Sequence, residues 1–437
     1  MTTKQEAQAI ALGMIGENPA KIFGIKNQTD IFSKVQPFFY DKGGLWWLWD
    51  NEVRCWKLSD EVDVLNMIDK TTEEDIITPG SRTIILNTLK QKGRLNIPKP
   101  IKKTWIQFKD MIYDCITGES FEATPEWFVT NPIPHNLSGN PETPTIDRIF
   151  KEWVGEKYLK TLKEIIAYCF LPDYPIHRLF CLIGGGMNGK SCFLNLLKKV
   201  IGDNNICSTE LDLLLASRFE ITRLHKKLVC LMGETNFNEM SKTSTIKKLT
   251  GGDTIGFEYK NKNPFEDTNY AKIILATNNL PTTTDKTLGF YRRWLIIDFP
   301  NKFSEKKDIL SEIPEEEYDN LITECFCNLK DLLSIREFTN EGTVEERMER
   351  YEAKSNFLEE FIKISTIEDL NSLITKADFY KRFSAWCFEN KHRQMSETSL
   401  GIVMKKLGIE SGTKKFEWMN DGRGGLARIW LGMKWKE

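Results

Sequence analysis

The sequence predicts an α/β fold, in which a sheet with covering helices follows a smaller α+β domain and precedes a domain of helices and one hairpin. Three observations predict it. The chain of 437 residues exceeds what one hydrophobic core usually serves, so two to four domains are expected. Between residues 179 and 303, short apolar runs alternate with helical or loop segments, the rhythm of a covered sheet. Finally, a glycine-rich loop joins one of these runs directly to a helical segment.

Composition narrows the class of protein. The chain is 41% hydrophobic and 28% charged, as ordinary globular proteins are, and its net charge of −2 gives no general signal for a protein that coats nucleic acid. The N-terminus lacks the pattern of a secretory signal, and no run approaches 18 apolar residues, so we expect no membrane partner. The ten cysteines form no paired framework, which predicts reduced thiols in a cytoplasmic compartment.

The first 146 residues divide into two parts. Residues 1–130 combine an amphipathic helix with aromatic strands that flank the turn dipeptide Asp50-Asn51, which predicts a small α+β domain. Residues 131–146 are rich in proline, which cannot continue a helix or a central strand, so we interpret them as a linker. Helical periodicity resumes at Ile146 and continues to about Phe170.

The remaining chain divides at about residue 335. Residues 147–335 hold the predicted α/β core and the helical region before it. In residues 336–437, Thr343 and Glu346 have the spacing of a capping box, which predicts a linking helix. Helices over residues 376–389 and 397–407, the second capped by Ser396, then precede two aromatic strands with a glycine-rich tip. This order predicts a winged-helix domain.

The glycine-rich loop at residues 184–191 matches the pattern GxxxxGK(S/T) in full, after a strand-like run and before a helical one. Glycines let backbone N–H groups face phosphates at a helix N-terminus, where the helix dipole also favours anions. The sequence therefore predicts a P-loop that binds ATP and Mg²⁺, in which Lys190 holds the β and γ phosphates and Ser191 holds the metal. The expected ATP-binding residues are Gly184, Gly185, Gly186, Met187, Asn188, Gly189, Lys190, Ser191 and Cys192.

Two further apolar runs end in polar residues suited to ATP hydrolysis. Glu234 follows the run at residues 228–232 and is the candidate base for the attacking water and a candidate metal ligand. Asn278 follows the run at residues 273–276 and suits a sensor of the γ-phosphate. Read alone, Glu234 is also an ordinary exposed acid, and an Asn at a strand end is common turn chemistry.

The order of these motifs resembles the superfamily 3 DNA helicases, within them the phage, plasmid and poxvirus primase-helicase type. The resemblance rests on the loop at 184–191, Gly-Glu-Thr from 233, Ile-Lys-Lys-Leu-Thr-Gly-Gly-Asp from 246, Ala-Thr-Asn-Asn-Leu-Pro from 276 and Tyr-Arg-Arg-Trp from 291. It is specific over residues 147–305 and weaker elsewhere. It implies an AAA+ core, a homo-hexameric ring that moves 3′ to 5′ on single-stranded or forked DNA, and a bacterial or archaeal host cell or a viral replication site.

The resemblance also implies an arginine that reaches the ATP site of the neighbouring subunit. Here that residue is Arg293 or Arg292, and a fixed guanidinium there would neutralise charge on the transferring phosphoryl group. Two arginines that pair with surface carboxylates are the plain alternative.

DNA contacts are expected in two places. The family resemblance implies a channel hairpin at residues 257–265, so that Lys260 and Lys262 would meet phosphates, although the segment alone is a polar turn between aromatic strand ends. Residues 376–436 hold 13 Lys and Arg against 6 Asp and Glu, and there we expect phosphate contacts from Lys405, Lys406 and Arg423. A solvated charged face is the alternative.

Two departures from the family limit these inferences. Many relatives carry two adjacent acids where this chain has Gly233 and Glu234, so the metal could rest mainly on Ser191, phosphates and water. The N-terminal 130 residues lack an acidic metal cluster, so we expect a separate primase or polymerase as partner. An ATP-switched replication initiator or loader, and a P-loop ATPase acting on RNA, remain alternative functions.

Overall fold

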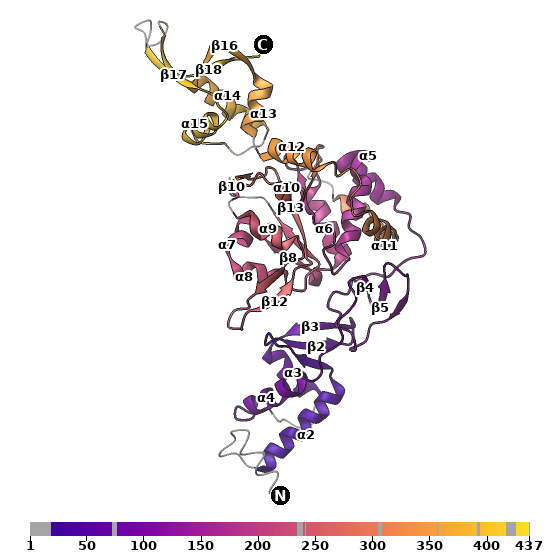
Figure 1. The fold of residues 1–437 in the computed structure, drawn as a ribbon. Helices are drawn as coiled ribbons and strands as arrows, with labels where there is room; N and C mark the ends of the chain where they lie inside the picture. The colour runs from indigo at the N-terminus through magenta and orange to yellow at the C-terminus, as the bar shows by residue number, and fades with distance from the viewer. Residues whose placement is uncertain are drawn as a thin grey trace.

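The computed structural model describes residues 19–71, 77–233, 239–240, 242–304, 308–355, 357–390, 394–416 and 425–436. Figure 1 shows a central α/β unit with a smaller unit at each end, one N-terminal and one C-terminal. The central unit is built on five parallel strands in the order β15-β7-β13-β9-β8. Their bounds are β7 Leu179–Ile183, β8 Ile206–Thr209, β9 Val229–Met232, β13 Lys272–Thr277 and β15 Trp294–Asp298. The predicted α/β class is confirmed, with a parallel sheet.

The three central strands are largely apolar because both faces of the sheet are covered, and Lys272 and Thr277, the two end residues of β13, are the polar exceptions. In β7, Phe180 and Leu182 enter one core, whereas Leu179, Cys181 and Ile183 enter the other. All five residues are buried. Burial of each large side chain contributes about 1.5–3 kcal/mol, so the sheet is the rigid platform of the molecule.

Helices from distant parts of the chain cover this platform. The first core contains α5, α6 and α11, and the second contains α9, α10 and α12. α5 is bent at Gly155, whose φ of 72° interrupts the helix. The bounds are α5 Pro144–Cys169, α6 Lys190–Ile201, α7 Leu211–Ala216, α8 Arg218–Ile221, α9 Thr243–Leu249, α10 Leu288–Tyr291, α11 Glu315–Ile335 and α12 Val344–Ser355. Short 3-10 turns span Asp203–Asn205, Thr222–Leu224 and Ile309–Glu312, and two short strands, β10 Glu239–Met240 and β14 Thr282–Thr283, pair in parallel.

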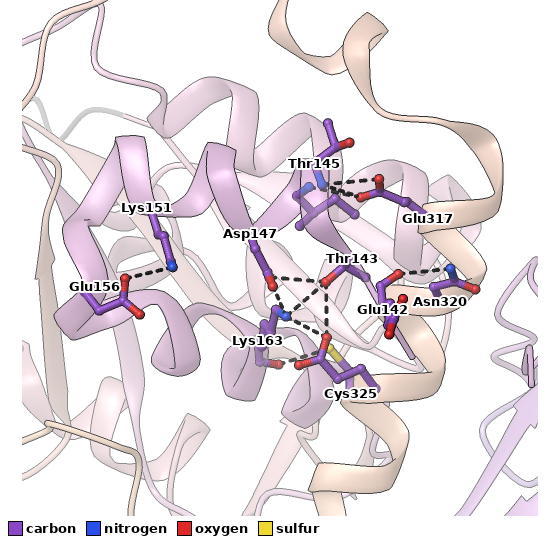
Figure 2. Close-up of polar contacts among 12 residues, drawn as sticks. Glu142, Thr143, Thr145, Asp147, Lys151, Glu156, Lys163, Glu317, Asn320 and Cys325 are labelled. Carbon is purple, nitrogen blue, oxygen red and sulfur yellow. Dashed lines mark hydrogen bonds and ion pairs between the residues drawn. The ribbon is translucent and has the colours of Figure 1, made fainter. Parts of the chain in front are cut away.

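A buried lysine joins α5 to α11 (Figure 2). The Nζ of Lys163 lies 2.5 Å from an Asp147 oxygen and 2.6 Å from a Glu324 oxygen, and it donates to the Thr143 hydroxyl at 3.0 Å. Burial lowers the pKa of Lys163, but the two carboxylates more than offset it, and the pKa lies above its usual value. Since one partner cannot be removed without leaving a buried charge, this cluster fixes the two helices in register.

The described residues of the N-terminal unit form two three-stranded sheets and three helices. Asp50, the last residue of β2, pairs with Cys55, the first residue of β3, so the hairpin has a four-residue turn. The predicted two-residue turn at Asp50-Asn51 was therefore wrong, because the Asp50 side chain accepts from the N–H groups of Glu52 and Val53 and closes a longer loop. The bounds are α2 Pro19–Val35, β1 Phe38–Tyr40, β2 Trp46–Asp50, β3 Cys55–Ser59, α3 Glu61–Thr71, α4 Arg82–Gly93, β4 Trp105–Phe108, β5 Met111–Asp114 and β6 Ser120–Glu122.

The proline-rich segment before α5 is irregular in conformation, but it packs closely against the central unit. Ile133 is fully buried, and the Asn131 amide donates to Asn205 at 3.0 Å and to the Lys226 carbonyl at 2.9 Å. His135 contacts Asp319 at 2.8 Å. The segment at residues 131–143, called the strap below, is thus fixed in place between the N-terminal and central units.

The C-terminal unit contains three helices and a three-stranded antiparallel sheet in the order β16-β18-β17. Strand β16 was not predicted, because its polar residues at 368–372 hide its pairing with β18. The predicted capping box at the start of α12 is confirmed, since Thr343 N donates to Glu346 at 2.7 Å and Glu346 N donates to the Thr343 hydroxyl at 3.2 Å. The bounds are α13 Phe357–Ser365, β16 Thr366–Thr375, α14 Lys376–Glu389, α15 Glu397–Lys406, β17 Ser411–Phe416 and β18 Gly425–Trp435. In the described part of the chain, no helix has both the length and the apolar character to cross a membrane.

Candidate functional site

The glycine-rich loop leaves the end of β7 and leads directly into α6. Gly186, Met187 and Gly189 have φ values of 88°, 52° and 92°, so the backbone takes left-handed turns that form a concave anion-binding nest. A Cβ on Gly184 would lie 1.8 Å from the Asn188 amide nitrogen, and one on Gly189 would lie 2.5 Å from the Trp153 ring. Because both positions exclude any side chain, the pattern of glycines is fixed by packing as well as by conformation.

Lys190, the first residue of α6, turns its side chain back into this loop. It is only 7% exposed, and its Nζ donates to the Gly184 carbonyl at 2.5 Å, to the Asn188 side chain at 3.1 Å and to the Asn278 side chain at 3.3 Å. These three acceptors are neutral oxygens. The N–H groups in the first turn of α6 have no acceptor within the helix and point the same way.

The strand order brings two predicted residues, Lys190 and Asn278, together. Asn278 follows β13, which lies between β7 and the strand that precedes Glu234. The carboxyl ends of parallel strands meet at one edge of a sheet, so Asn278 lies beside the loop. Glu234 itself lies outside the described residues.

Residues that hold the loop from behind were missed by sequence reasoning. The Asn188 amide donates to the Phe299 carbonyl at 3.1 Å, and Phe303 N donates to the Met187 carbonyl at 2.7 Å. The Trp153 ring fills the space behind Gly189. These partners come from α5 and from the segment after β15, and no local sequence signal connects them to the loop.

Asp298, the last residue of β15, pairs in register with Ile183, the last residue of β7, and so lies at this edge of the sheet. Burial raises the pKa of Asp298. The ion pairs with Arg350 at 2.6 Å and Lys354 at 3.1 Å lower this pKa by a larger amount, so it lies below its usual value. Both cations belong to α12. The helix therefore neutralises a carboxylate that would otherwise repel an anion in the loop.

A cleft of about 650 Å³ lies along α6 on the side of β8 and β9. The exposed Ser191 lines it, together with Asn195, Thr209, Glu210 and Gly233. Hydroxyl and carboxylate oxygens are the ligands that Mg²⁺ prefers, so the donor set fits this metal. Glu210 was not predicted, because it follows a short strand with no motif.

The two candidate arginines lie in different environments. Arg293 is 7% exposed, and its guanidinium donates to the Thr250 hydroxyl at 2.9 Å, to the Lys247 carbonyl at 3.2 Å and to the Gly289 carbonyl. Burial, followed by the charge of Arg292, lowers the pKa of Arg293. Arg292 is exposed. The expectation of an outward-reaching arginine therefore fits position 292, whereas Arg293 braces its own subunit.

The predicted hairpin forms. β11 Thr254–Phe257 pairs antiparallel with β12 Phe265–Thr268, and Lys260 and Lys262 are exposed in the loop between them. In the C-terminal unit Lys405 is exposed on α15. The Lys406 side chain and Arg423 lie outside the described residues.

Comparison with known proteins finds similarity to a family of unknown function, to a viral protein named as a putative helicase and to an uncharacterized mitochondrial protein. Residues 182–293 match a protein-family model described as "Family of unknown function (DUF5906)". The chain is 28% identical over 167 residues to "Putative helicase L207/L206" of Acanthamoeba polyphaga mimivirus, which covers 37% of this chain and 17% of that protein. It is also 25% identical over 142 residues to "Uncharacterized mitochondrial protein ymf21" of Marchantia polymorpha, covering 29% of this chain and 79% of that protein. The chain thus spans less than a fifth of the length of the viral relative.

Among solved structures, the chain is similar to the C-terminal region of NrS-1 in its apo form. One such structure has a TM-score of 0.47 at 14% identity, with 93% of this chain and 98% of that chain covered. A second, of residues 305–718, has a TM-score of 0.45 at 13% identity, with 95% and 100% covered.

Proposed function

We propose that this chain is an ATP-dependent replicative DNA helicase of the superfamily 3 type, with an AAA+ core and a C-terminal winged-helix domain. The observation that carries the proposal is the Lys190 ammonium, which is held inside a loop of left-handed turns and contacts the Asn278 side chain at 3.3 Å. A cation in an anion-binding nest next to a strand-end amide suits phosphoryl transfer, which depends on positioning and charge. The likeness to a viral protein named as a helicase supports the choice of motor.

In this proposal the loop from Gly184 to Cys192 binds the ATP phosphates, and Lys190 moves from the Gly184 carbonyl to the β and γ oxygens. Mg²⁺, when bound, would supply positive charge that offsets the charge of the phosphates. Ser191 would hold it, with Glu210 or Glu234 as the carboxylate nearby. Glu234 would polarise the attacking water, and Asn278 would orient it.

The wider assignments follow the same proposal. Six copies would form a ring on single-stranded or forked DNA, and Lys260 and Lys262 would contact phosphates in its channel. Lys405, Lys406 and Arg423 would add contacts from the winged helix, and a separate primase or polymerase would supply primers. The site of action would be a host cytoplasm or a viral replication site.

The direct test is the Lys190→Ala variant. Because it removes the charge that holds the phosphates, ATP turnover should fall on the order of 100-fold or more, while the melting temperature stays near that of the wild type. Lys160→Ala, which removes an exposed lysine of α5, is the matched control. Turnover at the wild-type rate in Lys190→Ala would remove the ATP site from this loop.

The alternative function is an ATP-switched initiator or loader, which would need the same site. Fork unwinding separates the two, because a motor unwinds DNA catalytically and a switch binds once per ATP.

Particle images with nucleotide add a second criterion. A six-fold ring around DNA agrees with the motor, and a persistent monomer or dimer agrees with the switch. Replacing DNA by RNA in the same assay tests the RNA alternative.

A further inference from the structure

A second large hollow lies away from the loop, between the hairpin β2–β3 and the central unit. This groove has a volume of about 1310 Å³. One wall is the turn of that hairpin, and the other is formed by the end of α6, the following turn and residues 222–227. The strap lies along its floor through Pro132 and Ile133. Two units of the chain therefore build the groove together.

Cations outnumber acids in the lining of this groove. Eight Lys and Arg residues line it against three acidic ones, Glu52, Asp110 and Asp203. Five of the eight also pair with carboxylates that lie outside the lining, namely Arg54 with Glu122, Lys57 with Asp50, Lys199 with Glu315, Arg223 with Glu220 and Lys226 with Asp267. The excess of cations in the lining contrasts with the whole chain, whose net charge is −2. His225 also lines the groove, and burial keeps its pKa below the usual value in spite of Asp267, so it adds no charge at neutral pH. Cations concentrated in a concave site focus the electrostatic field and attract anions.

Several of these cations are accessible. Lys109 and Arg223 are exposed, and Lys57 is exposed although it pairs with Asp50 at 2.5 Å. Lys227 is partly buried and donates to the Asn204 carbonyl at 2.5 Å, and burial lowers its pKa.

The groove adjoins both elements proposed to act in the motor. Tyr259, next to the hairpin lysine Lys260, lines the groove, and its hydroxyl lies 3.0 Å from the His225 Nδ1. Helix α6, which starts in the glycine-rich loop, ends in the groove with Lys198, and this lysine also lines the cleft beside Ser191. A single DNA strand bound at the hairpin β11–β12 would continue directly into the groove.

We propose that this groove binds the phosphate backbone of a single DNA strand that leaves the hairpin β11–β12. The choice of nucleic acid, rather than another polyanion, as the ligand of this groove rests on the proposed function. A single strand fits because the slot is little larger than a small-molecule pocket. Trp47 and Trp56 line the groove but are 2% and 3% exposed, so they cannot stack on bases. Binding is therefore electrostatic and independent of sequence.

The test measures binding of fluorescein-labelled dT20 to the full chain by anisotropy, without nucleotide and over a range of salt. The variant Lys57→Gln, Lys109→Gln, Arg223→Gln removes three accessible groove cations. Each lost phosphate contact lowers the slope of log affinity against log salt by about 0.7, so the slope should fall by about 2 and affinity roughly tenfold or more. The control Lys103→Gln, Lys160→Gln, Lys330→Gln removes three cations outside the groove and should stay within about twofold.

The outcomes separate the groove from the motor. Unchanged affinity and salt slope in the groove variant, at a wild-type melting temperature, would overturn the proposal. Tighter binding of a duplex than of dT20 would overturn the single strand, and binding of polyglutamate in place of dT20 would assign the groove to an acidic protein segment. Basal ATP turnover should be unaffected. A wild type that binds dT20 through the groove but has no ATPase would refute only the proposed function, and the reverse result would refute only the groove.

Discussion

Arg293 and Arg292 are neighbours in the chain, yet they are expected to respond differently to substitution. Arg293→Ala should lower the free energy of unfolding by about 2–4 kcal/mol, because it leaves the Thr250 hydroxyl and two carbonyl groups without their buried donor. Arg292→Ala should change it by less than about 0.5 kcal/mol, since the side chain is exposed. Urea unfolding measures both. Wild-type stability in Arg293→Ala together with lost ATPase would return the outward role to position 293.

Lys272 begins β13 with its side chain fully buried, over the rings of Tyr168 and Tyr174 and against the Leu171 carbonyl. Burial lowers its pKa to about 7. Below that pH both the folded and the unfolded chain carry the proton. Between pH 7 and the ordinary lysine pKa only the unfolded chain does, so the free energy of unfolding rises with pH by up to about 1.4 kcal/mol per unit.

The Lys272→Met variant, which keeps the length of the side chain without its charge, isolates this effect. Between about pH 7 and pH 9, the free energy of unfolding of the wild type should rise by about 2–3 kcal/mol relative to that of the variant, as measured by urea unfolding at each pH. For the control variant Lys160→Met, at an exposed site, the free energy of unfolding should change with pH in parallel with that of the wild type. Parallel curves for Lys272→Met would mean that Lys272 stays charged throughout, held by the rings and the carbonyl.

At the scale of elements, what could be predicted from sequence is what local chemistry specifies. The capping box at Thr343, the Ser396 cap and the loop between β7 and α6 depend on neighbours within a few residues, and all three are present. The pairing of strand β16 and the packing of the proline-rich strap depend on partners far along the chain, so neither gave a local signal, although the prolines themselves indicated a break in secondary structure. The same holds in the candidate site. Lys190 and Asn278 could be named from their motifs, but Trp153 and the Thr250 partner of Arg293 required the fold.

The hairpin β11–β12 tests whether an element transmits force without taking part in hydrolysis. Its lysines, Lys260 and Lys262, are exposed at the tip, whereas its base is fixed by Asp267, which contacts Lys226 at 2.8 Å. Replacing both tip lysines by alanine should leave the fold and basal ATPase near wild type, and remove stimulation by single-stranded DNA and fork unwinding. Paired assays at matched salt measure the two activities. Unwinding at the wild-type rate would exclude these lysines from DNA transport.

At the scale of the whole molecule, the parallel pairing of β7 and β15 separates the two groups that hydrolysis is proposed to need. Leu179 pairs with Trp294 and Ile183 with Asp298, so the loop follows one edge of the sheet while Arg292 precedes the opposite edge. At about 3.3 Å per residue, strands of this length keep the two edges roughly 15 Å apart. Arg292 therefore cannot serve the loop of its own subunit, and a contact with ATP requires a neighbour in an assembly.

Mixing two inactive variants tests this requirement. Lys190→Ala subunits keep Arg292 and lose the ATP site, whereas Arg292→Ala subunits keep the ATP site and lose the arginine. In a closed ring of randomly mixed subunits, roughly a quarter of the interfaces at equal mixing would join an intact site to an intact arginine, so ATPase should reappear and peak near that ratio. Mixing Lys190→Ala with the double variant Lys190→Ala, Arg292→Ala is the control and should give none, because no subunit supplies a site. Native mass spectrometry shows whether mixed rings form. Mixed rings without any recovered ATPase would rule out Arg292 as the group that acts across the subunit boundary.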